Sequence, residues 1–250
     1  MNCKVFIETS TLVSASVYAV SKELDVPLKH HFYDLSFPLF DYLKKHIKQR
    51  IGVTTITVEE EARSVIAEAV LEEIEQEVLK KPERRELLFK LYSAFCNISN
   101  DNLSKNISTL LREPIPEDEK ELIYLEVEEL YSEMSGYDIR ERAKEMAKFV
   151  PKRFKKLAEE IYREQFRPHQ PLHRPPSTAD KKILSEAIYL FRRYRKENPK
   201  FILYLASTDH HFSPSRDHKV KTAHEKIYQR FGIICDWPDI IMQKISGTTP

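Results

Sequence analysis

The sequence has few glycines, few cysteines and no long apolar run. Its 250 residues include four glycines, and neither GxxxxGK[ST] nor GxGxxG occurs, which removes most phosphate-cradling loops. The three cysteines, Cys3, Cys96 and Cys235, form no CxxC pair, which argues against a thiolate zinc site and a disulfide framework. No stretch approaches the roughly 18 consecutive apolar residues of a membrane span. The chain starts with a short apolar run ending in Glu8 and not with a signal peptide, so a soluble, cytoplasmic protein is expected.

Charges of the two signs balance, with 40 Lys and Arg against 39 Asp and Glu and a formal net charge of +1. Such a chain does not coat nucleic acid through net charge alone, although local basic patches remain open. Residues 152–156 and 192–196 are basic runs that could follow an RNA backbone, and a solvated helix surface is the alternative. Residues 113–133 are acidic and residues 148–174 are basic, which favours pairing between helices of this part of the chain.

Four short apolar runs, rich in β-branched and aromatic residues, are typical of buried strands. They are Lys4–Glu8, Gly52–Val58, Phe201–Thr208 and Gly232–Pro238. Segments with helical spacing of apolar residues separate these runs. Uninterrupted apolar strands that alternate with helices predict a parallel sheet covered on both faces, in a three-layer α/β/α fold.

A long block between the second and third predicted strands has helical spacing and no strand signal. A proline-rich stretch, 166–177, ends this block because it cannot continue a helix. We therefore predict a core formed by residues 1–82 and 171–250. Residues 83–170 are predicted to be an all-helical insertion or cap.

Acidic residues stand where the predicted strands end, or where a helix begins at the same edge of the sheet. They are Glu8, Glu59, Glu60, Glu61, Asp180 and Asp209. Ligands bind at the carboxyl ends of the strands of an open parallel sheet, so carboxylates from four segments are expected to converge there. Clustered carboxylates repel one another unless a divalent cation neutralises them, and hard oxygen ligands suit Mg²⁺ or Mn²⁺. This chemistry is suited to phosphodiester hydrolysis.

Five segments resemble motifs of the PIN domain family, in the order in which that family has them. They are VFIETSTLVSA, TTITVEEEA, STADKKILSEAIYL, LYLASTDHHF and GIICDWPDII. The resemblance implies a five-stranded parallel sheet in the order 3-2-1-4-5. It also implies an enzyme that hydrolyses RNA phosphodiester bonds with carboxylate-bound Mg²⁺ or Mn²⁺. RNA is then the expected partner and a homodimer is left open, whereas no antitoxin-like partner is expected, because small PIN toxins are much shorter.

The acidic residues and their neighbours receive expected roles. The predicted catalytic residues are Glu8, Glu61, Asp180 and Asp209. The predicted metal ligands are the same four residues together with Glu60. The predicted substrate contacts are Thr9, Ser10, Ser207, Thr208 and His211, and the four hydroxyl residues have the alternative role of orienting the acids.

Local interpretations compete with these roles. Thr57 and Glu60 have the spacing of a capping box, and so do Ser177 and Asp180. A capping role for Glu60 would leave Glu61 as the better metal candidate.

Two positions depart from the PIN pattern. Glu8 stands where the family usually has Asp, and His211 stands where a further Asp is common. A PIN-like module that binds RNA or a protein without efficient catalysis is therefore the second interpretation.

Overall fold

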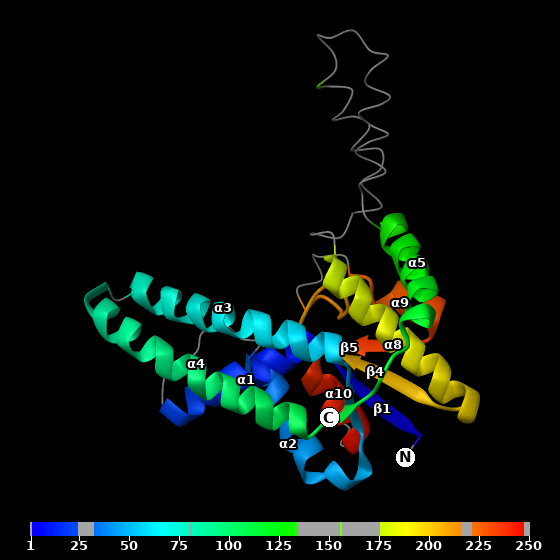
Figure 1. Cartoon of the computed structure of the whole chain (residues 1–250), viewed down its shortest axis with the longest axis horizontal. Helices are drawn as coiled ribbons and strands as arrows, with labels where there is room; N and C mark the ends of the chain where they lie inside the picture. The colour runs from blue at the N-terminus through cyan, green and yellow to red at the C-terminus, as the bar shows by residue number, and fades with distance from the viewer. Residues whose placement is uncertain are drawn as a thin grey trace.

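The structure, a computed structural model, describes residues 2–24, 33–80, 82–134, 156, 176–216 and 222–247. At its centre lies a five-stranded parallel sheet in the order β3-β2-β1-β4-β5 (Figure 1). The strands are β1 (Cys3–Ile7), β2 (Gly52–Thr54), β3 (Leu111–Arg112), β4 (Ile202–Ala206) and β5 (Ile234–Asp236). The predicted parallel sheet and its strand order are confirmed.

The central pair of strands explains the apolar runs in the sequence. β1 pairs with β4 over five positions, from Cys3 opposite Ile202 to Ile7 opposite Ala206. The last three residues of β1, 5–7, have no exposed surface. A parallel strand is covered on both faces, so its sequence is a continuous apolar run and does not alternate.

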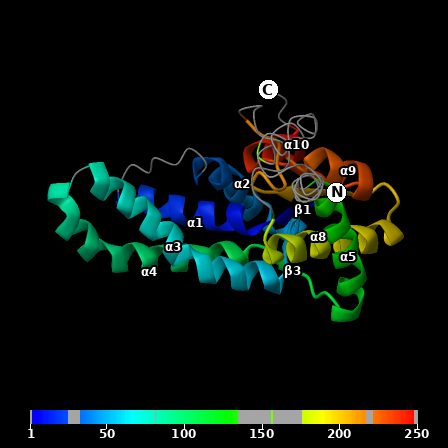
Figure 2. The same cartoon turned by 90° about the horizontal axis from the view of Figure 1, so that it is seen from above.

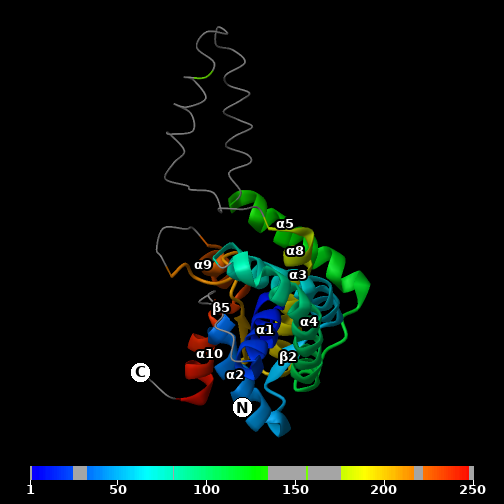
Figure 3. The same cartoon turned by 90° about the vertical axis from the view of Figure 1, so that its left-hand side faces the viewer.

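Helices cover both faces of the sheet and complete the predicted three layers. They are α1 (Thr9–Leu24), α2 (Tyr33–Lys45), α3 (Ile56–Lys80), α4 (Arg85–Ser108), α5 (Glu117–Met134), α8 (Thr178–Glu197), α9 (His224–Phe231) and α10 (Pro238–Ser246). Short 3-10 turns lie at Ile47–Gln49 and Pro82–Arg84. Figure 3 shows α2 and α10 on one side of the sheet and α5 and α8 on the other. Within the described ranges, no helix combines the length and the apolarity needed to cross a bilayer.

Helices α3 and α4 lie side by side as a long pair that extends away from the sheet, with α1 packed against both (Figure 2). The α4 side chain of Asn106 donates to the Ser16 hydroxyl of α1 at 3.1 Å, and both groups are buried. Phe95 and Leu103 of α4 are buried in the same apolar core as β1. Helix α4, from the predicted insertion, is thus packed on the predicted core.

Two predictions about strands are wrong. The run Gly52–Val58 is a strand only as far as Thr54, because α3 begins at Ile56 and its first turn packs into the core, where Val58 has no exposed surface. This packing overrides the strand preference of β-branched residues. The block 83–170 contains β3, whose two residues are too few to show a strand period. The division into a core and an insertion stays a prediction, because 135–175, apart from Lys156, lies outside the described residues.

The acidic helix α5 pairs with basic residues outside the predicted block. Glu126 forms an ion pair with Arg192 of α8, and Glu128 forms one with Lys181 of the same helix. Arg193 of α8 pairs with Glu113. The prediction that the acidic segment pairs with 148–174 falls on residues of which only Lys156 is described. Two arginines of the basic run 192–196 in α8 thus form ion pairs, one with α5 and one with the segment before it.

Candidate metal centre

A pocket lies at the carboxyl edge of the sheet, next to the ends of β1 and β4. It has a volume of about 270 Å³, and its lining includes four acidic residues, Glu8, Glu61, Asp180 and Asp209. They come from four segments: the end of β1, the first turns of α3, the start of α8 and the loop after β4. The predicted convergence of these four carboxylates is therefore confirmed as a matter of position.

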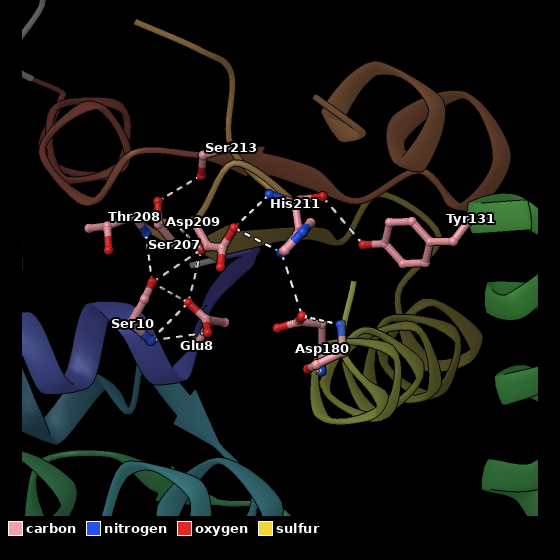
Figure 4. Close-up of polar contacts among 10 residues, drawn as sticks. Glu8, Ser10, Tyr131, Asp180, Ser207, Thr208, Asp209, His211 and Ser213 are labelled. Atoms are coloured by element: carbon pink, nitrogen blue, oxygen red, sulfur yellow. Dashed lines mark hydrogen bonds and ion pairs between the residues drawn. The ribbon is translucent and has the colours of Figure 1, made fainter. Parts of the chain in front are cut away.

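Glu8 is buried and lies directly before α1 (Figure 4). The Ser10 backbone N–H donates to both carboxylate oxygens at 3.0 Å. The Ser10 and Ser207 hydroxyls donate to Oε2 at 2.5 and 2.9 Å. The backbone carbonyl of Glu8 accepts from Leu12 at 3.1 Å, as the N-cap residue of a helix does. Residues at the start of α1 and in the loop after β4 thus fix the position of the Glu8 carboxylate.

The three consecutive acids after β2 have three different environments. Glu61 lines the pocket and accepts a hydrogen bond from the Thr9 hydroxyl at 2.5 Å. Glu59 is buried and forms an ion pair with Arg112 of β3. Glu60 is exposed and is not part of the pocket lining, so the structure does not bring this predicted ligand to the others. Successive helix residues point about 100° apart, so one of three neighbours faces a given pocket.

The two proposed capping boxes have different outcomes. In the first, Thr57 lies inside α3 and its hydroxyl donates to Glu186 at 2.5 Å, so the predicted box with Glu60 is wrong. In the second, the Ser177 N–H donates to Asp180 Oδ2 at 2.7 Å, and the Asp180 N–H donates to Ser177 Oγ at 3.0 Å. Asp180 therefore caps the first turn of α8 and lines the pocket at the same time.

The loop after β4 brings Asp209 and His211 next to Asp180. The His211 N–H donates to Asp209 Oδ1 at 2.8 Å, and His211 Nδ1 lies 3.0 Å from the same oxygen. His211 Nδ1 also lies 3.5 Å from Asp180 Oδ2 (Figure 4). These three side chains offer one ligand atom each, all within 4.8 Å of one another.

The predicted substrate contacts take part in hydrogen bonds that hold the site together. Thr9 holds Glu61, and the Ser10 and Ser207 hydroxyls hold Glu8. Ser207 Oγ also accepts from the Asp209 N–H at 2.9 Å. The Thr208 backbone N–H donates to Ser10 Oγ at 2.9 Å, while its side chain points away from Glu8 in Figure 4. The alternative role of orienting the acids thus matches Thr9, Ser10 and Ser207, and contact with substrate stays a prediction.

Burial and repulsion from neighbouring charges raise the pKa values of two acids of the pocket, Glu8 and Glu61. Burial, together with the charge of Asp209, raises the pKa of Glu8 to about 8, against the lowering effect of hydrogen bonds from Ser10 and Ser207. Burial also raises the pKa of Glu61, as do the charges of Asp180 and Asp209, while the Thr9 hydrogen bond lowers it.

Asp209 differs from the other two acids. Burial raises the pKa of Asp209, but the hydrogen bonds and charge of His211 outweigh burial, and the net shift is downward. The environment of Asp209 therefore favours its charged form.

The donor set fits a divalent cation. Two carboxylate oxygens and an imidazole nitrogen are ligands that first-row divalent ions accept. Across the part of the chain that the structure describes, no Lys or Arg forms an ion pair with Glu8, Glu61, Asp180 or Asp209. A cation would supply the positive charge that these side chains lack.

Comparison with known proteins gives no family. A scan against protein-family models found no match, and searches of curated proteins and of solved structures found none. The PIN-domain resemblance therefore rests on the sequence motifs alone and stays a prediction.

The sequence did not indicate Tyr131, a residue outside the pocket lining that supports the loop carrying His211. Tyr131 lies on α5, is buried, and donates its hydroxyl to the His211 carbonyl oxygen at 3.3 Å. The apolar spacing of LIYLEVEELY indicates a buried helix face, but nothing in that pattern connects it to the loop after β4. The Ser213 hydroxyl anchors the same loop by donating to the Ser207 carbonyl at 2.7 Å.

Proposed function

We propose that this chain is a PIN-like, metal-dependent ribonuclease that hydrolyses RNA phosphodiester bonds. One observation carries the proposal: four carboxylates from separate segments line one pocket, and no described Lys or Arg pairs with them. Glu8 is buried and the other three acids are half-buried. Gathering like charges away from water without a Lys or Arg partner costs free energy, so such a cluster is hard to explain as a device for stability. A divalent cation offsets this cost, and RNA phosphates are its natural ligands.

Asp180 and Asp209 are the side chains best placed to hold Mg²⁺ or Mn²⁺, since their ligand oxygens lie within 4.8 Å of each other. When bound, the cation lowers the pKa of a water molecule and offsets negative charge at the phosphodiester. Glu61, oriented by Thr9 and with a raised pKa, is suited to accept the proton of that water. Glu8 adds a buried fourth carboxylate, oriented by Ser10 and Ser207.

Hydrolysis of labelled RNA in the presence of Mn²⁺ tests the proposal. Asp209→Asn removes one charge from the site, and we expect the rate to fall by about 100-fold or more, because a few kcal/mol of transition-state stabilisation are lost. Asp236→Asn is the matched control. Asp236 ends the neighbouring strand β5 at the same edge but pairs with Lys244 at 2.7 Å. Equal rates in the wild type and Asp209→Asn would defeat the proposal.

A PIN-like module that binds RNA or a protein without efficient cleavage is the second candidate. It is favoured by Glu8, which stands at the position where PIN domains usually have Asp. Both of its carboxylate oxygens already accept hydrogen bonds from Ser10, and Oε2 accepts one more from Ser207. In this case Glu8→Asp changes cleavage little, and calorimetry detects no tight Mn²⁺ binding. Tight Mn²⁺ binding contradicts this candidate.

A further inference from the structure

His211 lies where a cation bound by the two aspartates would meet a nitrogen donor. Its Nδ1 atom is 3.0 Å from Asp209 Oδ1 and 3.5 Å from Asp180 Oδ2. Figure 4 shows the imidazole between the two carboxylates. The ring nitrogen and the two carboxylate oxygens are therefore close enough to bind one ion together.

The backbone of His211 is held on both sides, independently of its ring. The N–H donates to Asp209 Oδ1 at 2.8 Å, and the carbonyl accepts from Tyr131, a buried residue of α5. The side chain itself is only 15% exposed. A ligand held in this way does not need to be ordered when the ion binds, which favours tight and specific ligation.

Donor chemistry decides which ion this arrangement suits. Mg²⁺ strongly prefers oxygen ligands and loses its water reluctantly, so an imidazole nitrogen contributes little to its binding. Mn²⁺ and the later first-row divalent ions accept imidazole nitrogen together with carboxylate oxygen. We infer that His211 is a direct ligand of the cation and that it makes the pocket select Mn²⁺ over Mg²⁺. This inference rests on the proposed function, because it requires that the pocket bind a divalent cation.

Pulsed electron paramagnetic resonance of Mn²⁺ bound to the full chain tests the inference without an activity assay. We expect the wild type to show ¹⁴N modulation from a bound imidazole. In His211→Asp, which offers oxygen in place of nitrogen, the modulation is expected to disappear. The matched control is His210→Asn, because His210 lies in the same loop but is exposed, with its ring against Trp237. This variant is expected to keep the signal.

Calorimetric titration with MnCl₂ and with MgCl₂ gives the second measurement. The ratio of Mn²⁺ affinity to Mg²⁺ affinity is expected to fall by at least about tenfold in His211→Asp, since loss of even an outer partner of a metal ligand costs about 10–100-fold. The ratio is expected to stay unchanged in His210→Asn. Thermal unfolding followed by circular dichroism establishes that each variant is folded.

The outcomes separate this inference from the proposed function. Mn²⁺ binding by the wild type without ¹⁴N modulation overturns the role of His211 and leaves the ribonuclease proposal standing, even if no His211 variant folds. Modulation that persists in His211→Asp, or an unchanged affinity ratio, overturns it as well. Absence of any binding of either ion to the wild type overturns both proposals.

Discussion

Two buried carboxylates in this molecule, Glu186 and Glu8, differ in their partners. Glu186 of α8 is 1% exposed and lies 2.7 Å from the Lys120 amino group of α5, with hydroxyls of Thr55 and Thr57 donating to it. Glu8 is 3% exposed, and its partners are hydroxyls and a backbone N–H. Both side chains are satisfied by hydrogen bonds, but of the two only Glu186 forms an ion pair with a Lys or Arg of the described residues.

The difference separates acids that connect elements of the fold from acids that line the pocket. Glu186 joins α8, α5 and the start of α3, and Glu59 with Arg112 joins α3 to β3. These pairs connect elements of the fold. Among the described residues, no Lys or Arg pairs with the carboxylates of the pocket, and the cationic group beside Asp209 and Asp180 is the imidazole of His211. Burial of an acid is therefore not by itself a sign of function, and the partner of the acid must be considered as well.

The largest expected effect comes from breaking the paired group. Glu186→Ala leaves the Lys120 amino group, whose side chain is 13% exposed, without its nearest carboxylate. We expect the free energy of unfolding, measured by urea denaturation at pH 7 in EDTA, to fall by about 3–5 kcal/mol. The control is Glu117→Gln, since Glu117 faces the same lysine at 3.6 Å but is 86% exposed, and its loss is expected to cost less than about 1 kcal/mol. Similar losses in both variants would contradict the distinction.

Neutralising an acid of the pocket, in contrast, is expected to increase the free energy of unfolding at high pH. The pKa of Glu8 is about 8 in the folded chain, above its ordinary value of 4.5, so folding favours the protonated form. Its stabilising contribution is present in full below pH 4.5 and is lost as the pH rises through 8. In EDTA, we expect Glu8→Gln to remove a decline in unfolding free energy of the order of a few kcal/mol between pH 5 and pH 9.

Urea denaturation at several pH values measures this decline. The exposed Glu60, as Glu60→Gln, serves as the control and is expected to keep the wild-type decline. A wild type and a Glu8→Gln variant with parallel pH profiles would show that the pKa of Glu8 is the same in the folded and the unfolded chain, and that the pocket tolerates its acids without a cation.

Addition of Mn²⁺ is expected to stabilise the wild type, because the ion binds the folded pocket. The gain is about 2.7 kcal/mol at 100 times the dissociation constant, and thermal unfolding with and without the ion measures it. Asp209→Asn is expected to lose most of this gain and Asp236→Asn to keep it. An equal gain in all three proteins would place the bound ion away from the pocket.

The smallest effect is expected from the contact that supports His211. Tyr131→Phe removes one hydroxyl bond, worth about 1 kcal/mol of unfolding free energy, and keeps the buried ring. Tyr42→Phe removes a comparable bond, to the Ile245 carbonyl at 3.4 Å, and Tyr42 is not part of the pocket lining. Both variants are expected to lose similar stability, but only Tyr131→Phe is expected to weaken Mn²⁺ binding in calorimetry. Equal Mn²⁺ affinities would assign Tyr131 a structural role alone.

The sequence predicts the fold well where elements are long or uniformly apolar. β1 and β4 are continuous apolar runs, so their burial and their parallel pairing follow from the pattern. β3 has two residues and escapes any periodicity argument. The end of β2 was misplaced because Ile56–Val58 has the composition of a strand, and only tertiary packing makes it the start of a helix.

For the site, position relative to strand ends predicts which acids meet. Glu8 and Asp209 follow neighbouring strands, so their meeting is a consequence of the topology. The choice among Glu59, Glu60 and Glu61 depends on the helix start to within one residue, which sequence patterns do not resolve. Tyr131 and the Lys120–Glu186 pair arise from contacts between segments distant along the chain, and no local spacing reports them.

The sheet narrows from its centre to its margins, from five residues in β1 and β4 to three in β5 and two in β3. An outer strand of two or three residues leaves few unsatisfied backbone groups on which another chain could add a strand. One of the two outer strands, β3, also ends in the charged residue Arg112. The two edges of the sheet therefore offer little backbone to which a strand of another molecule could pair and start aggregation.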